Sequence, residues 1–93
     1  MENLVTAFIN YLREEKKLSQ NTLMSYKRDI EQYIMYLQDK NVENIQQSSK
    51  TTISTYMNHQ NKQGRAITTI SRSLASIRAF YRFLISHDFV KGN

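Results

Sequence analysis

The chain has 93 residues, 40% of them hydrophobic and 23% charged, which suits one compact domain and excludes a disordered composition. It contains no cysteine, and no apolar run approaches the roughly 20 residues of a membrane span, so disulfides, thiolate metal sites and a bilayer-crossing helix are excluded. The net charge of +5 lies in the second half, because residues 1–43 hold six cations and seven acids whereas residues 44–87 hold six cations and no acid.

Residues 3–17 have the pattern of an amphipathic helix. Leu4, Phe8 and Leu12 recur at every fourth position and place one apolar stripe along the segment. The segment closes on charged residues, of which Lys16 and Lys17 are favourably placed at the negative end of the helix dipole. We therefore expect a first helix that buries one face.

A second helix is predicted to begin after Ser19, which is a good N-cap, with Leu18 packing against Leu23 across the helix start. Its apolar positions follow a 3.6-residue period: Leu23, Tyr26, Ile30, Tyr33, Ile34 and Leu37. Its opposite face is polar: Asn21, Ser25, Arg28 and Gln32.

A shorter third helix is predicted over residues 51–62, capped by Ser48 or Ser49. Gly64 is expected to end it, because glycine adopts positive φ without a steric cost. The inward side chains are Ile53, Tyr56 and Met57. A polar loop over residues 39–50 precedes this helix and has two expected anchors on the core, Val42 and Ile45.

A fourth helix is predicted from Thr68 or Thr69 to about His87. Its core stripe is Ile70, Leu74, Ile77, Tyr81 and Leu84. Its far, solvent-facing side is Arg72, Ser76 and Ala79, and Arg78 falls near the edge of the core. Strand signals are weak along the whole chain, so an all-α bundle of four helices is the expected fold.

The residues of catalytic and metal sites are missing from the pattern. His59 and His87 are 28 residues apart and have no carboxylate at the spacing of metal ligands. Gly64 stands alone, so there is no glycine-rich phosphate loop. We expect no enzymatic activity, metal or cofactor in this chain.

Two helix starts combine short hydroxyl and amide side chains with cations. Residues 19–22 are followed by Ser25, Lys27 and Arg28, and residues 68–73 are followed by Ser76 and Arg78. Free N–H groups at a helix start bind anions, and arginine can form bidentate hydrogen bonds with phosphate or guanine. The alternative is that these are ordinary caps and surface arginines. Together with the acid-free second half, they favour a nucleic-acid partner.

Two segments resemble signatures of the N-terminal core-binding domain of tyrosine recombinases, the family of the phage integrases. Residues 18–30, LSQNTLMSYKRDI, resemble the signature LSxNTLxxYxRDL. Residues 69–84, TISRSLASIRAFYRFL, resemble TIxRxLSAIRxFYxFL, with Ala75-Ser76 where the family often has Ser-Ala. The ending Lys91-Gly92-Asn93 resembles the start of the family's interdomain linker.

This resemblance implies a SAM-like orthogonal bundle of four helices that forms one half of a C-shaped clamp on DNA. A separate C-terminal domain would hold the catalytic Arg, Lys, His and Tyr, and none of that set matches this chain. The second and fourth helices would approach the major groove. The implied contacts, with the helix-start residues added, are Asn21, Thr22, Ser25, Lys27, Arg28, Thr69, Ser71, Arg72, Ser76 and Arg78. Residues implied to be structural are Leu23, Tyr26, Leu74, Phe80 and Tyr81.

We therefore predict that residues 1–90 are a DNA-binding domain and that residues 91–93 begin a linker to a catalytic domain. The expected partners are double-stranded DNA and, in a full-length parent, other recombinase protomers; the isolated domain is expected to be a cytoplasmic monomer with no membrane contact. The second and fourth helices should turn their Ser, Thr and Arg sides outward as one cationic patch, and Arg72→Ala should weaken binding without unfolding the domain. The alternative is a helical protein–protein interaction module with a basic docking face.

Overall fold

Four α-helices and one short 3-10 helix make up the computed structural model, which describes residues 1–48 and 50–91. In chain order the elements are α1 (Glu2–Glu14), α2 (Gln20–Asp39), η1 (Ile45–Gln47), α3 (Lys50–Lys62) and α4 (Ile67–Ser86). The described residues contain no strand, so the predicted all-α bundle of four helices is confirmed. Ser49, a predicted cap, and the linker residues Gly92 and Asn93 lie outside the described residues.

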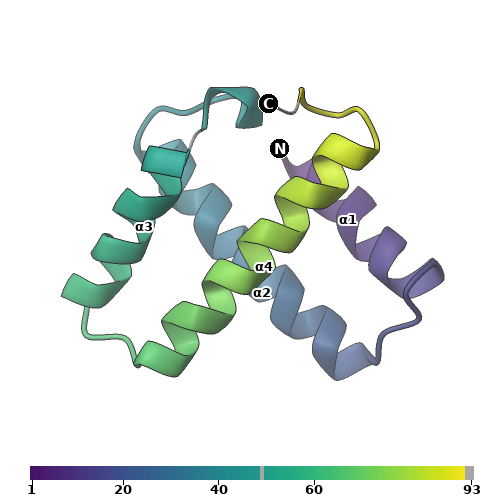
Figure 1. Cartoon of the computed structure of the whole chain (residues 1–93), viewed down its shortest axis with the longest axis horizontal. Coiled ribbons are helices and arrows are strands. Elements are labelled where there is room, and N and C mark those ends of the chain that lie inside the picture. The colour runs from purple at the N-terminus through teal and green to yellow at the C-terminus, as the bar shows by residue number, and fades with distance from the viewer. Residues whose placement is uncertain (49, 92–93) are drawn as a thin grey trace.

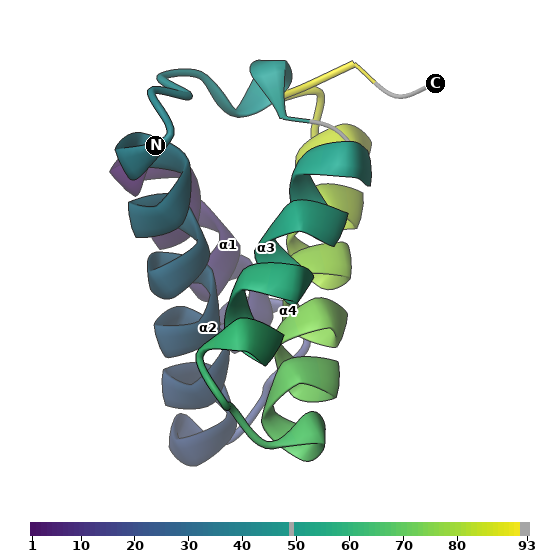
Figure 2. The same cartoon turned by 90° about the vertical axis from the view of Figure 1, so that its left-hand side faces the viewer.

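The two long helices cross near their middles. α2 and α4 form the arms of an X in Figure 1, and the N-terminal ends of both arms point to the same side of the molecule. α1 packs against both α2 and α4, and α3 packs against α4. Figure 2 shows the same arrangement from the side, with α2 and α4 on opposite sides of the bundle and both N-terminal ends again directed alike.

Aromatic rings fill the space between α1, α2 and α4. Phe8 is fully buried, and its ring lies 5.3 Å from Phe80, 5.5 Å from Phe83 and 5.9 Å from Tyr26, measured between centroids. Such tilted and edge-on pairs add to the free energy of burying the rings. The apolar stripe predicted on the first helix therefore packs against α2 and the C-terminal half of α4.

A second group of rings joins α2, α3 and α4. The ring of Tyr33 lies 5.2 Å from that of Tyr56, and the Tyr33 hydroxyl is 2.9 Å from the hydroxyl of Tyr81. Tyr81 also shares a very short hydrogen bond with Ser48, just after η1. Burial raises the pKa of Tyr33, Tyr56 and Tyr81 above the ordinary value of 10.0. The hydroxyls of Tyr33 and Tyr81 are hydrogen-bonded inside the fold, as buried polar groups require.

The helix ends follow the capping signals closely. Ser19 caps α2 by accepting a hydrogen bond from the Thr22 backbone N–H, and Gly64 has the predicted positive φ of 78°. α1 ends at Glu14, three residues earlier than predicted, because the chain turns through Lys17 at φ 52°. A short 3-10 helix that was not predicted, η1, begins after Asn44, where Asn44 and Gln47 form a reciprocal capping box.

The burial pattern of α4 differs from the prediction. Ser76, expected to face solvent, is 4% exposed, and Ser73 is 2% exposed. Ile70, Leu74 and Tyr81, expected in the core, are only half-buried. Ser76 lies against Asp29 of α2, whereas Leu74 and Tyr81 line a groove between α3 and α4 and so stay partly exposed.

Candidate nucleic-acid interface

The N-terminal halves of α2 and α4 carry most of the side chains predicted to contact DNA. We call residues 20–28 and 67–72 the N-terminal edge, because both segments lie on the same side of the crossing (Figure 1). Of the predicted contacts within it, Asn21, Thr22, Lys27, Arg28, Ser71 and Arg72 are exposed, and Ser25 and Thr69 are half-buried. The positive ends of two helix dipoles therefore face one side of the molecule, with hydroxyl and amide groups beside them.

The two helix starts differ in how their N–H groups are satisfied. At α2, Ser19 Oγ accepts from the Thr22 N–H at 3.3 Å and donates to the Thr22 hydroxyl at 3.0 Å. At α4, the N-cap residue is Ala66, which provides no side-chain acceptor. The first-turn N–H groups of α4 are therefore more available to an external anion than those of α2.

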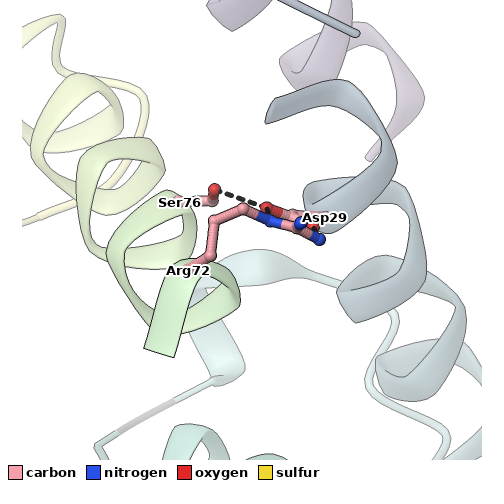
Figure 3. A network of polar contacts seen from close by, with 3 residues as sticks. All are labelled: Asp29, Arg72 and Ser76. Carbon is pink, nitrogen blue, oxygen red and sulfur yellow. Dashed lines mark hydrogen bonds and ion pairs between the residues drawn. The ribbon is translucent and has the colours of Figure 1, made fainter. Parts of the chain in front are cut away.

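A polar network joins the two helices where they cross. Figure 3 shows the Arg72 guanidinium lying against the Asp29 carboxylate, with the Ser76 hydroxyl on the same acid. Arg72 donates from Nε to Asp29 Oδ2 at 3.1 Å and from Nη2 to Oδ1 at 2.9 Å. Ser76 donates its hydroxyl to Oδ2 at 2.8 Å. We call Asp29, Arg72 and Ser76 the crossing network.

Burial makes this network a structural feature as well as a charged one. The Asp29 side chain is 2% exposed, whereas the Arg72 side chain is 46% exposed. Removing one partner of a buried ion pair leaves an uncompensated charge, which is strongly destabilising. The hydrogen bonds and charge of Asp29 also raise the pKa of Arg72. The structure therefore does not support the expectation that Arg72→Ala leaves the fold undisturbed.

Two of the predicted positions on α4 are corrected by the structure. The expectation that Ser76 lies on the outer face is wrong, because its hydroxyl is buried against Asp29. Arg78, expected near the edge of the core, is exposed. Both differences reflect how α4 is rotated about its axis, with Ser76 turned toward Asp29 of α2 and Arg78 turned toward solvent.

The cations of the two helices line two different grooves, so the expectation of one common cationic patch is not confirmed. Lys27 and Arg28 line a groove of about 780 Å³ between α1 and α2. Arg78 lines a different groove, of about 950 Å³, between α3 and α4. Arg72 lies between them, at the crossing. The structure thus brings Arg72 to the acid of α2 and separates it from Arg78, six residues further along the same helix.

Asp29 is the residue that the sequence analysis missed. It follows Tyr26 by three positions and precedes Tyr33 by four, so the helical period already places it beside the apolar stripe. An acid at such a position needs a buried partner, and the acid-free second half offers only cations and hydroxyls. Gln60 is a second missed residue; it is 1% exposed on a helix whose polar residues were expected to face solvent.

The histidines and carboxylates of the described residues do not gather into a metal site. Within residues 1–48 and 50–91, no three His, Cys, Asp or Glu side chains gather as a metal site would require. His59 lies against the ring of Tyr36, and His87 against those of Tyr11 and Phe83. None of the described helices is both long enough and apolar enough to cross a bilayer.

Comparison with known proteins gives one consistent result. Residues 5–88 match the family described as "Phage integrase, N-terminal SAM-like domain". The chain is 41% identical over 85 residues to a protein of Caldanaerobacter subterraneus subsp. tengcongensis whose name places it among the tyrosine recombinases. It is 40% identical over 94 residues to the tyrosine recombinase XerD of Oceanobacillus iheyensis, and 37% identical over 86 residues to that of Halalkalibacterium halodurans.

These alignments cover 91%, 100% and 91% of this chain, respectively. The chain spans only 29%, 32% and 29% of the length of these three relatives. No solved structure matches the chain at a significant level.

Proposed function

Because this chain belongs to the family of phage-integrase N-terminal SAM-like domains, we propose that it is the DNA-binding arm of a site-specific tyrosine recombinase. Its relatives named as recombinases are about three times longer, so the strand-cutting chemistry would belong to a part of the parent protein beyond this domain. The domain itself would hold duplex DNA, as one half of a clamp, while that chemistry proceeds.

The observation that carries this proposal is the common direction of the two helix starts. α2 and α4 send their N-terminal ends to the same side of the crossing (Figure 1). The first turns of α2 carry hydroxyl, amide and cationic side chains, and those of α4 carry hydroxyls and Arg72. The crossing network fixes one helix relative to the other through three hydrogen bonds. A pair of helix ends held in this way suits the phosphates that border a groove of DNA.

The proposed contacts fall into two kinds. Asn21, Thr22, Ser25, Lys27 and Arg28 on α2, with Thr69, Ser71 and Arg72 on α4, would bind phosphates and a few base edges. Asp29 bonds to Nε and Nη2 of Arg72, so the Nη1 donors of this half-exposed side chain can serve a phosphate oxygen. Ser76 would act indirectly, by holding Asp29 in place. Phosphate contacts should supply most of the affinity and base contacts some sequence preference.

The proposal can be tested by titrating the isotope-labelled domain with a short DNA duplex and following amide chemical shifts. We expect the perturbed amides to cluster at residues 20–28 and 67–72. Affinity should fall steeply with salt, because each neutralised phosphate releases counterions. Affinity that is unchanged between low and moderate salt, or shifts confined to other surfaces, would contradict the proposal.

A matched pair of arginine variants sharpens the test. Arg28→Ala should weaken binding and lower the slope of log affinity against log salt by about 1. Arg82→Ala removes the same charge from an exposed residue in the C-terminal half of α4, so it should leave the slope nearly unchanged. Equal effects of the two variants would mean that only net charge matters and that the N-terminal edge is not the binding surface.

A further inference from the structure

A groove between α3 and α4 forms a second basic surface, separate from the N-terminal edge. Its walls are the first part of α3 and the C-terminal part of α4, and η1 and the residues after α4 close one end. Figures 1 and 2 show these segments at the end of the bundle opposite the N-terminal ends of α2 and α4. A partner in this groove would therefore leave the N-terminal edge free for DNA.

The groove combines an apolar floor with a cationic rim. Its apolar lining includes Ile53, Met57, Leu74 and Ile85, and the Ile85 side chain is 43% exposed. Its cations are Lys50, Arg78, Arg82 and Lys91. Among the described residues that line it there is no acid, so nothing within the groove neutralises these four charges.

The groove between α1 and α2 provides a contrast within the same domain. It is of similar size, but its lining holds Glu2 and Glu31 along with three cations. The charges there are largely balanced from inside the chain. The unbalanced charge is therefore a specific property of the α3–α4 groove and does not reflect the composition of the domain alone.

Several hydrogen bonds within the chain hold the walls of the groove in place. Tyr81, which lines the groove, is linked on one side to Ser48 and on the other to the buried Tyr33. The residues after α4 turn back, because the N–H groups of Phe89 and Val90 both donate to the Leu84 carbonyl. The Lys91 N–H then donates to the Gln46 side chain at 2.9 Å. A groove fixed in advance binds with a smaller loss of conformational entropy.

We propose that the α3–α4 groove binds an acidic protein segment that presents apolar side chains along one face of a helix. The apolar residues would cover the floor, and the carboxylates would pair with the arginines and lysines of the rim, in the helix-in-groove mode of recognition. DNA fits the rim but not the floor, because a phosphodiester backbone offers no apolar surface to bury. A second copy of this chain would bring a further net charge of +5 and fits less well.

The experiment uses a labelled synthetic peptide with leucines at positions i, i+3, i+4 and i+7 and glutamates at the remaining positions. We expect saturable binding, with amide shifts at residues 50–58 and 74–85. A peptide with serines in place of the leucines, and another with lysines in place of the glutamates, should both bind at least about tenfold more weakly, the equivalent of roughly 1.4 kcal/mol. Equal binding of all three peptides would overturn the proposal.

Charge variants of the protein complete the test. Arg78→Ala and Arg82→Ala should each weaken peptide binding about three- to tenfold, a common effect for one charge at a partly exposed rim. Arg28→Ala, which lies outside the groove, should leave it unchanged. An equal loss in Arg28→Ala would overturn the proposal, and so would displacement of the peptide by duplex DNA or by anionic phospholipid vesicles. Sedimentation that shows self-association through residues 74–85 would assign the groove to a second copy instead and overturn it as well.

These results are independent of the proposed DNA contacts. Loss of DNA binding in Arg28→Ala with intact peptide binding supports both assignments, whereas loss of peptide binding in Arg82→Ala with intact DNA binding separates the groove from the edge. A domain that binds the peptide but not DNA would overturn the proposed function and leave this inference standing.

Discussion

The two halves of α4 use the same kind of residue for opposite purposes. In the N-terminal half, Arg72 gives two hydrogen bonds to a buried acid and helps to hold α4 against α2. In the C-terminal half, Arg78 and Arg82 are exposed and line a groove that contains no described acid. The charge of Arg72 is balanced by Asp29, whereas the groove lining holds no described acid to balance the charges of Arg78 and Arg82.

This difference shows that charge counted along a sequence overstates the charge that a surface presents. All six cations of residues 44–87 look equivalent in a stretch without acids. One of them is paired with an acid 43 positions earlier in the chain, and that pair contributes to stability instead of surface potential. The comparison of Arg72 with Arg78 can be tested directly, since both are arginines on one helix.

The largest effect should come from removing Arg72. Arg72→Ala leaves the Asp29 carboxylate buried without its cation and should lower the free energy of unfolding by about 3 kcal/mol. Arg78→Ala removes an exposed side chain and should change it by less than about 0.5 kcal/mol. Urea unfolding followed by circular dichroism measures both values. Equal destabilisation by the two variants would remove the distinction between the two halves of α4.

High pH should destabilise the domain through the tyrosines beside the α3–α4 groove and leave the crossing network charged. The pKa of Tyr33 is raised by its burial, so the native state keeps this proton more tightly than the unfolded state, whose value is near 10.0. Stability is therefore complete below pH 10 and falls as the pH rises above it, by about 1.4 kcal/mol per pH unit for this one group.

Thermal unfolding at pH 9, 10 and 11 measures the alkaline effect. Tyr33→Phe keeps the ring and removes the proton, so its stability should depend less steeply on pH than that of the parent protein. A parent protein whose melting temperature is the same at pH 9 and pH 11 would show that the buried hydroxyls do not differ between the folded and unfolded states.

The smallest effect should come from Ser76, which contributes one of the three hydrogen bonds on Asp29. Ser76→Ala should lower the free energy of unfolding by about 1 kcal/mol, the usual net contribution of one hydrogen bond. Ser71→Ala is the matched control, because Ser71 is exposed on the same helix. If the control is destabilised as much as Ser76→Ala, the cost arises from the helix itself and not from the crossing network.

The fold could be predicted because local sequence signals mark most of its helices. The apolar period of α2, the Ser19 cap and the positive φ of Gly64 each depend on neighbouring residues, and each is confirmed. The 3-10 helix at Ile45 was missed, since its capping box is short and lies in a segment without an apolar period. The two predicted anchors beside it, Val42 and Ile45, do pack onto the core.

The candidate site was less predictable, because it depends on how α4 is rotated about its own axis. The sequence pattern gives that helix apolar residues on more than one side, so the stripe through Leu74 and Tyr81 was chosen as the core. The structure buries Ser73 and Ser76 as well, and Ser76 lies against Asp29 of α2. The rotation of α4 depends on a neighbouring helix that is distant in sequence. This rotation determines which arginine is paired and which is exposed.

The absence of a side-chain cap at Ala66 has a consequence for the order of events during association. An anion arriving at the start of α2 competes with Ser19, which already holds the Thr22 N–H, whereas an anion arriving at α4 has no such internal competitor to displace. The start of α4 should therefore be the point of first capture, and α2 should settle onto its ligand afterwards. The two helix starts would then bind the ligand in sequence, α4 first and α2 second. The slower contact at α2 would set the rate at which the initial complex becomes the fully bound complex.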